Sequence, residues 1–230
     1  MLSEFSGFPA GTLKFLRDLA KNNNREWFQQ HRQRYEEFFL QPSLTLIEAM
    51  QKPLAKSAPL LQAIPKGVGG SLMRIYRDTR FSKAKEPYKT NIGIHFRHQL
   101  GCDVHAPGCY LHVAVDECFF GAGIWMPDSE PLRLIRTKIH DDPNAWKKVV
   151  GNKRFASQFK LHEERLKSMP RGFAKESPMA EAIRLTSFIG VCQIDEKLLG
   201  GPELVKFVDQ AVRDAKPLMN FLCEALNVPY

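Results

Sequence analysis

The residues best suited to chemistry are concentrated between positions 74 and 90. This segment contains six lysines and arginines, two acidic residues and three aromatic residues. Arginine offers paired N–H donors to a phosphate or carboxylate, lysine offers a point charge, and an aromatic face can stack on a base or ring. We therefore expect an anion-binding surface here. Its predicted members are Arg74, Arg77, Arg80, Lys85, Tyr88 and Lys89, with Trp125 nearby.

Asp78 lies within this basic run. The surrounding cations should lower the pKa of its carboxyl group, which suits it to orienting an arginine, and we also keep it as a candidate catalytic residue. Alternation along a strand beginning at residue 72 would place Arg74 and Arg77 on opposite faces. The competing interpretation is structural: Asp–Arg pairs would merely fix a charged hairpin.

A second group of reactive side chains follows. It consists of His95, His98, Cys102, His105, Cys109 and His112. The middle members lie in an expected loop and lack the paired spacing typical of zinc sites, so we predict no metal site. If Phe96 pairs with Leu111, His95 falls opposite His112 on one face of the sheet. The two imidazoles would then be either structural or an acid–base pair, and both are candidate catalytic residues.

The charge of the chain is unevenly distributed. The net charge is +8, with eight Lys or Arg against two Asp or Glu in residues 66–100 and twelve against four in residues 133–175. Between them, residues 101–132 hold five acidic residues and no Lys or Arg. Two basic blocks around an acidic one favour an anionic partner over a cationic one.

Cysteine content and hydropathy indicate the compartment. The five cysteines form no C-x-x-C pair, and the first residues lack the pattern of a signal peptide. No apolar run reaches the roughly 18 residues needed to cross a bilayer. We therefore expect a cytoplasmic protein with reduced thiols and no membrane partner.

Hydrophobic periodicity predicts the elements that must position these residues. Residues 1–64 and 128–230 have the helical period, whereas residues 65–127 alternate like strands. Four strands are expected within residues ~70–126: 72–77, 90–97, 110–115 and 118–126, with a tight turn before the fourth. Helices, then strands, then helices predict an α+β fold with an antiparallel sheet, as a single domain over residues 1–230.

Several runs in the chain resemble those of one protein family. The hallmark is R-I-Y-R-D-x-R-F-S-x-x-K-x-P-Y-K-T, found here at residues 74–90, and further matches lie at residues 24–28, 106–108, 121–127, 141–143 and 171–173. In these runs the chain resembles a mainly bacterial family described only as a domain of unknown function. Ala84 and Thr186 depart from its usual pattern. The resemblance implies no activity, substrate or cofactor.

Three functions are compatible with the sequence. The first is a basic surface that binds nucleic acid or another phosphate-bearing ligand. The second is an enzyme acting on a small phosphorylated or carboxylated substrate with a histidine acid–base, which requires a deep pocket. The third is a structural or interaction scaffold. We assign no cofactor, and the ligand, the oligomeric state and the presence of enzyme activity are left open.

Overall fold

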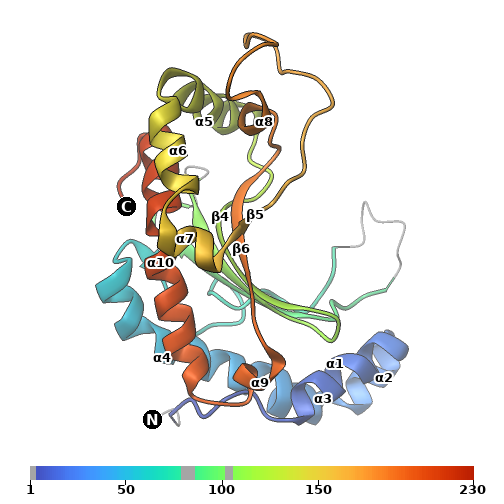
Figure 1. Ribbon diagram of the computed structural model, residues 1–230. Coiled ribbons are helices and arrows are strands. Elements are labelled where there is room, and N and C mark those ends of the chain that lie inside the picture. The colour runs from blue at the N-terminus through green and yellow to red at the C-terminus, as the bar shows by residue number, and fades with distance from the viewer. Residues whose placement is uncertain (1–3, 79–85, 102–105) are drawn as a thin grey trace.

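The computed structural model describes residues 4–78, 86–101 and 106–230. It has an α+β fold, in which helices pack against one antiparallel sheet of six strands in the order β1-β2-β3-β4-β6-β5 (Figure 1). Within the described residues, no helix is both long and apolar enough to pass through a lipid bilayer.

The elements follow one another in three groups. The N-terminal helices are α1 (Gly11–Lys21), α2 (Arg25–Gln30), α3 (Arg32–Tyr35), the π-helical turn η1 (Glu36–Leu40) and α4 (Gln41–Ser57). The strands are β1 (Leu61–Gln62), β2 (Ile92–His98), β3 (Gly108–Val113), β4 (Cys118–Ile124), β5 (Lys160–Leu161) and β6 (Phe188–Gln193). The later helices are α5 (Ser129–Asp141), α6 (Pro143–Val150), α7 (Lys153–Gln158), α8 (Ala180–Ile183), α9 (Glu196–Leu199) and α10 (Glu203–Ala225).

Helix starts follow the polar residues that the sequence offers as caps. Asn24 accepts a hydrogen bond from the backbone N–H of Trp27 at 2.9 Å and so begins α2. Asp142 and Asn152 cap α6 and α7 in the same way. Pro42 does not interrupt the N-terminal helices, because it lies in the first turn of α4, where its missing N–H is not needed.

The sheet has six strands, whereas the sequence predicted about four. Residues 72–77 do not form a regular strand; Leu72 and Tyr76 make only isolated bridges, to Ile94 and Tyr88. The two-residue strands β1 and β5 are too short to leave a periodic signal. Strand β6 lies in a region expected to be helical, because its buried run of small and apolar residues has no clear period of two.

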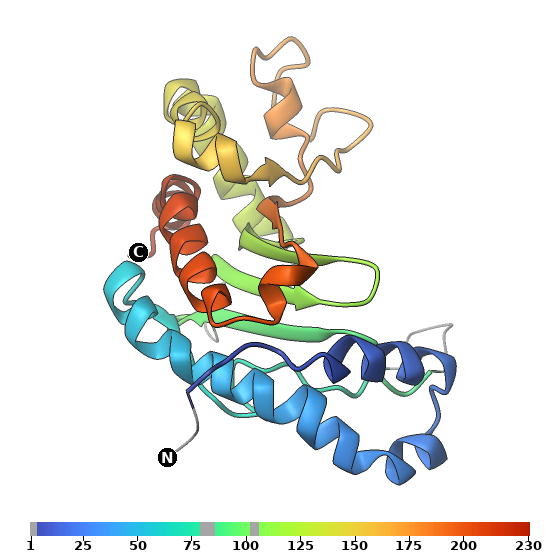
Figure 2. The same cartoon turned by 60° about the horizontal axis from the view of Figure 1, so that its bottom comes forward.

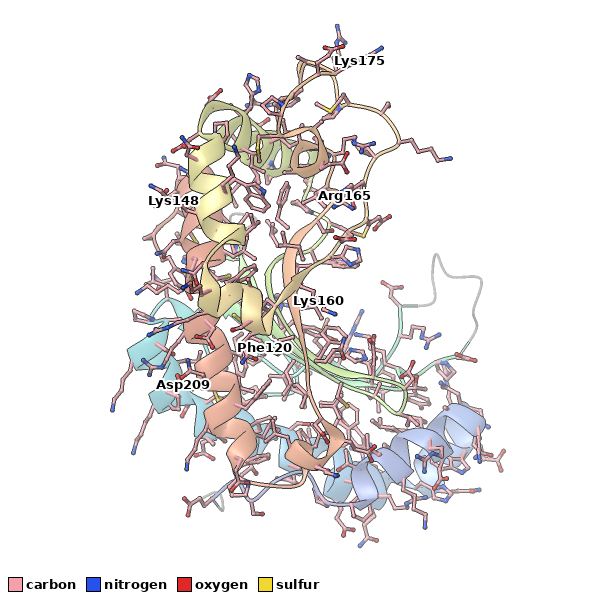
Figure 3. All side chains as sticks on the ribbon, in the orientation of Figure 1. Phe120, Lys148, Lys160, Arg165, Lys175 and Asp209 are labelled. Carbon is pink, nitrogen blue, oxygen red and sulfur yellow. The ribbon has the colours of Figure 1, made fainter. Side chains whose placement is uncertain are left out.

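The two faces of the central strands differ in what covers them. On one face, buried apolar side chains such as Ile94, Leu111 and Phe120 pack beneath α4, α7 and α10, and Phe120 is seen between the sheet and α10 in Figure 3. Figure 2 shows α4 and α10 side by side along this face. The other face of the same strands is left open by the helices (Figure 1).

The pairing of β2 with β3 differs from the expected register by two residues. Phe96 pairs with Cys109, so His95 lies opposite Tyr110, and His112 lies opposite Gly93. A slip of two residues preserves the face on which each side chain lies. The prediction that His95 and His112 share one face is therefore confirmed, and the prediction that they are directly opposite is wrong.

Residues 74–78 and 86–89 form a two-stranded projection beside β2, which we call the basic arm. Its halves are joined by backbone hydrogen bonds from Arg77 to Pro87 at 2.9 Å and from Lys89 to Ile75 at 2.7 Å. Asn23 anchors the arm to the turn between α1 and α2, because its side-chain amide bonds both the C=O and the N–H of Tyr88. A helix turn thus fixes the base of the arm.

We predict that Asn23→Ala lowers the free energy of unfolding by about 1–3 kcal/mol, because it leaves both backbone groups of Tyr88 without their partner. Chemical denaturation measures this change. Asn22→Ala is the matched control, since Asn22 makes only an exposed hydrogen bond within its own helix end. Equal losses for the two variants would contradict the anchoring role.

Candidate functional site

A cavity of about 790 Å³ lies on the open face of the sheet. Its walls include residues from β2, β3, β4 and β6, together with Trp125 and His162. The volume is within the range of small-molecule sites. The described lining residues are also mainly apolar, with a few polar groups among them, which is the usual composition of such sites.

Glycines keep the floor of this cavity open. A Cβ at Gly93 would lie 2.7 Å from the Tyr110 hydroxyl, and one at Gly108 would lie 2.7 Å from His95 Nε2. Gly123 pairs with Gly108 across β3 and β4 and has a φ of +131°, a conformation that other residues rarely adopt. Larger residues at Gly93 or Gly108 would crowd the polar side chains, and one at Gly123 would collide with the backbone of Phe188 in β6.

His95 and Arg97 form the cationic end of the cavity. Both line it from β2, and Arg97 Nε donates a hydrogen bond to His95 Nδ1 at 3.3 Å. Burial and the neighbouring guanidinium lower the pKa of His95 to about 4, so its ring is neutral at pH 7. Because Nδ1 accepts a hydrogen bond, the single ring proton lies on Nε2. The neutral ring therefore presents an N–H donor beside Gly108.

A second polar group lies across the floor from His95. Tyr110 Oη is 3.2 Å from His112 Nδ1, and the amide of Asn91 donates to Tyr110 Oη at 3.4 Å. Burial is the main cause that raises the pKa of Tyr110 and lowers that of His112. The phenol thus keeps its proton and the imidazole stays neutral, so this pair offers a hydrogen-bond donor and a short path for a proton.

The rim of the cavity carries an aromatic pair and a carboxylate. The Trp125 indole, 55% exposed, contacts the His162 imidazole with ring centroids 4.7 Å apart. Glu117 lines the cavity from the turn between β3 and β4, the end away from the loop that follows Arg97. The cavity is therefore polarised, with a cation at one end and an anion at the other.

Three described cations of the basic arm, Arg74, Arg77 and Lys89, are not among the residues that line the cavity. Burial is the first cause that lowers the pKa of Lys89, and the charges of Arg74 and Arg77 lower it further, so the three groups lie near one another. Residues 72–77 do not form the regular strand assumed from the sequence, so strand alternation does not determine where Arg74 and Arg77 lie. Arg77 also pairs with Glu86 at 3.1 Å. Arg80 and Lys85 lie outside the described residues.

Two other predicted members of the arm have different surroundings. The ring of Tyr88 is buried and stacks on Phe28, with centroids 4.1 Å apart, so the aromatic face exposed on the arm belongs to Tyr76. Asp78 is exposed on the arm and is not among the described residues that line the cavity.

The histidines and cysteines between residues 95 and 112 do not act as one group. His98 is buried; it accepts from the N–H of Leu100 through Nδ1 and bonds the carbonyl of Pro229 through Nε2. Cys109 lies on the packed face, and burial raises its pKa. Cys102 and His105 are outside the described residues. Within the described part of the chain, no three His, Cys, Asp or Glu side chains are arranged to bind a metal ion.

The second basic block, residues 133–175, is dispersed. Figure 3 shows Lys148 on α6, Lys160 at β5 and Lys175 at the tip of a loop, on separate parts of the molecule. Arg165, from the same block, pairs with Glu163 and Glu181. This block does not extend the basic arm into one surface.

Sequence reasoning missed three residues that shape the cavity. Arg97 and Tyr110 lie on the same sheet face as His95, and they were given no role from the sequence. His162 also received no role, and its backbone N–H donates to the carbonyl of Ile189 in β6. The alternation of side chains along β2 and β3 could have indicated that Arg97 and Tyr110 lie beside His95. No local sequence pattern indicates that His162 contacts Trp125.

The fold and site define an α+β protein with a small-molecule-sized cavity on the open face of an antiparallel sheet. The model of a conserved hypothetical protein family, DUF2461, matches residues 11–221, so the chain belongs to that family. This confirms the family expected from the sequence. Comparisons with curated proteins and with solved structures give no match.

We predict that His95→Gln alters how stability depends on pH. The pKa of His95 in the folded protein, about 4, is below its ordinary value of 6.5, so the unfolded chain takes up this proton first as the pH falls. The free energy of unfolding of the wild type should therefore fall by about 1–3 kcal/mol more than that of His95→Gln between pH 7 and pH 4.

Denaturation at a series of pH values measures this difference. His140→Gln, at an exposed position on α5, is the control and should follow the wild type. Parallel wild-type and His95→Gln curves would show that His95 is not held neutral by the fold.

Proposed function

We propose that this protein binds a small molecule bearing a phosphate or carboxylate in the cavity on the open sheet face. The observation that carries the proposal is the pairing of Arg97 with the neutral N–H donor of His95 at one end of that cavity. A guanidinium presents N–H groups in a planar fork that matches an oxyanion. The proposal shares its ligand class and its need for a pocket with the second function derived from the sequence, an enzyme with a histidine acid–base, and it assigns His95 a binding role in place of proton transfer.

The electrostatics of Arg97 support this role. Its Nε is used by His95, while no ion pair joins its guanidinium to a carboxylate of the described residues. The terminal nitrogens therefore remain as donors on an exposed side chain. Glu117 repels an anion from the other end of the cavity, so the two charges together orient a ligand with its anionic group toward Arg97.

The neutral state of His95 determines what it contributes. At pH 7 its Nε2–H donates a hydrogen bond to a ligand oxygen instead of releasing a proton. A donor placed in a partly desolvated cavity stabilises negative charge on that oxygen, whether in a bound anion or in a reaction. If the cavity is catalytic, the proton path available is the one between Tyr110 and His112.

We predict that Arg97→Gln weakens binding of inorganic phosphate and of benzoate at least about tenfold, because a charge-assisted hydrogen bond is lost. The rise in melting temperature with ligand concentration measures the affinity. The control is Arg154→Gln on α7, an exposed arginine away from the cavity, which should bind like the wild type. Binding that Arg97→Gln leaves unchanged, or no binding of either anion by the wild type, would refute the proposal.

Nucleic-acid binding by the basic arm is the second candidate function. The observation that favours it is that burial and then the charges of Arg74 and Arg77 lower the pKa of Lys89, so both arginines lie near this lysine. The exposed ring of Tyr76 on the same arm offers a stacking surface for a base. The dispersed second basic block adds nothing to this surface.

Fluorescence anisotropy with a labelled 20-nucleotide single-stranded RNA tests the second candidate. We expect binding that falls steeply with salt and that weakens several-fold in Arg74→Gln and in Lys89→Gln. Lys147→Gln on α6 is the control for loss of one surface charge. Salt-insensitive binding, or equal losses in the arm and control variants, would exclude the arm as the binding surface.

A further inference from the structure

Two large apolar side chains at the rim of the cavity are exposed to water. Trp125 is 55% exposed and Met126 is 62% exposed, directly after the end of β4. Burying such side chains would stabilise a fold by roughly 1.5–3 kcal/mol each. Trp125 is also one of the residues that line the cavity, so its exposed surface is available to a bound molecule.

The backbone directly after Trp125 is strained and is held by a buried partner. Met126 has a φ of +41°, in the left-handed region that a residue with a side chain rarely adopts. Its N–H donates to the hydroxyl of Ser187 at 2.9 Å, and Ser187 is fully buried. Strained backbone held by buried partners is concentrated at ligand sites, which makes this turn a candidate for one.

The His162 ring supports the indole without covering it. The two rings meet at an interplanar angle of 59°, which is a tilted contact and not a parallel stack. The nearest carboxylate, that of Glu164, is 3.6 Å from His162 Nε2, and this buried nitrogen has no hydrogen-bond partner among the described residues. An indole that is braced on one side and remains largely exposed offers a face for a ring to stack on.

The surroundings of Trp125 favour a flat ligand. Gly108 and Gly123 pair with each other on the floor and present backbone without side chains, and Trp125 follows Gly123 by two residues. The His95 Nε2–H adjoins Gly108, so an anionic group received by Arg97 and His95 lies beside this glycine floor.

We infer that the ligand of this cavity carries a planar heteroaromatic ring that stacks on Trp125, joined to the phosphate or carboxylate group that Arg97 receives. A mononucleotide has this chemistry, and a cavity of about 790 Å³ has room for one. The inference rests on the proposed function, which supplies the anionic group of the ligand, and it adds the planar ring. Stacking of a base on an aromatic side chain contributes about 1–3 kcal/mol, so the ring should raise affinity noticeably.

Two matched ligands separate the ring from the anion. Calorimetric titration of the wild type with AMP, UMP and FMN should show at least one that binds about tenfold more tightly than ribose 5-phosphate, which has the sugar and phosphate without a ring. In Trp125→Ala this advantage should vanish, so that the ring ligands and ribose 5-phosphate bind with similar affinities. Trp125→Phe, which keeps an aromatic face, should retain most of it.

Tryptophan fluorescence gives an independent measure of the same contact. The chain has three tryptophans, at positions 27, 125 and 146. The tighter-binding ring ligand should quench the emission of the wild type and of Trp27→Phe, and should not quench Trp125→Phe.

The outcomes distinguish the inference from the proposed function. If every ring ligand binds only as well as ribose 5-phosphate, or if Trp125→Ala keeps the full advantage, the ring is excluded while anion binding stands. If neither ribose 5-phosphate nor the ring ligands bind, the proposed function fails and the inference fails with it.

Discussion

A strand sends successive side chains to opposite faces of its sheet, and in β2, β3 and β4 this alternation separates a packed face from an open one. Ile94, Leu111 and Phe120 lie on the face beneath the helices, and they are buried completely. Their neighbours His95 and Tyr110 must therefore lie on the other face. The same constraint that builds the core thus places polar groups and glycines together on a surface that the helices do not cover.

The electrostatic character of that surface comes from one side chain acting on another. Arg97 donates to His95 and, together with burial, holds the imidazole in its neutral form, so a cation and a neutral donor lie side by side. This arrangement differs from the basic arm, where three cations of like charge are crowded and Arg77 is already paired with Glu86. The cavity therefore offers an enclosed volume with a cation and a neutral N–H donor at one end. The basic arm offers cations and the exposed ring of Tyr76.

Much of the fold could be predicted from the sequence, because long periodic segments and polar caps act locally. Asn24, Asp142 and Asn152 begin helices, as polar capping residues commonly do, and the turn between β3 and β4 is where the sequence indicated. Strand β6 was missed, since a short buried strand has no period that separates it from a helix.

The candidate site was predicted in part. Strand alternation correctly placed His95 and His112 on one face of the sheet. The register of β2 with β3 and the approach of His162 to Trp125 depend on contacts between residues distant in sequence, so they were not predicted. Arg80 and Lys85, which the sequence also selected, lie outside the described residues.

The central claim is that an anion bound in the cavity lies against Arg97 and His95. The most direct measurement is the pKa of His95, followed by NMR of its ring nitrogens with and without saturating benzoate, whose own carboxylate stays ionised between pH 5 and pH 8. The account predicts a pKa of about 4 in the free protein and a clear rise when benzoate binds, because a nearby negative charge favours the imidazolium. A pKa near 6.5 in the free protein, or one that does not change when benzoate binds, would contradict it.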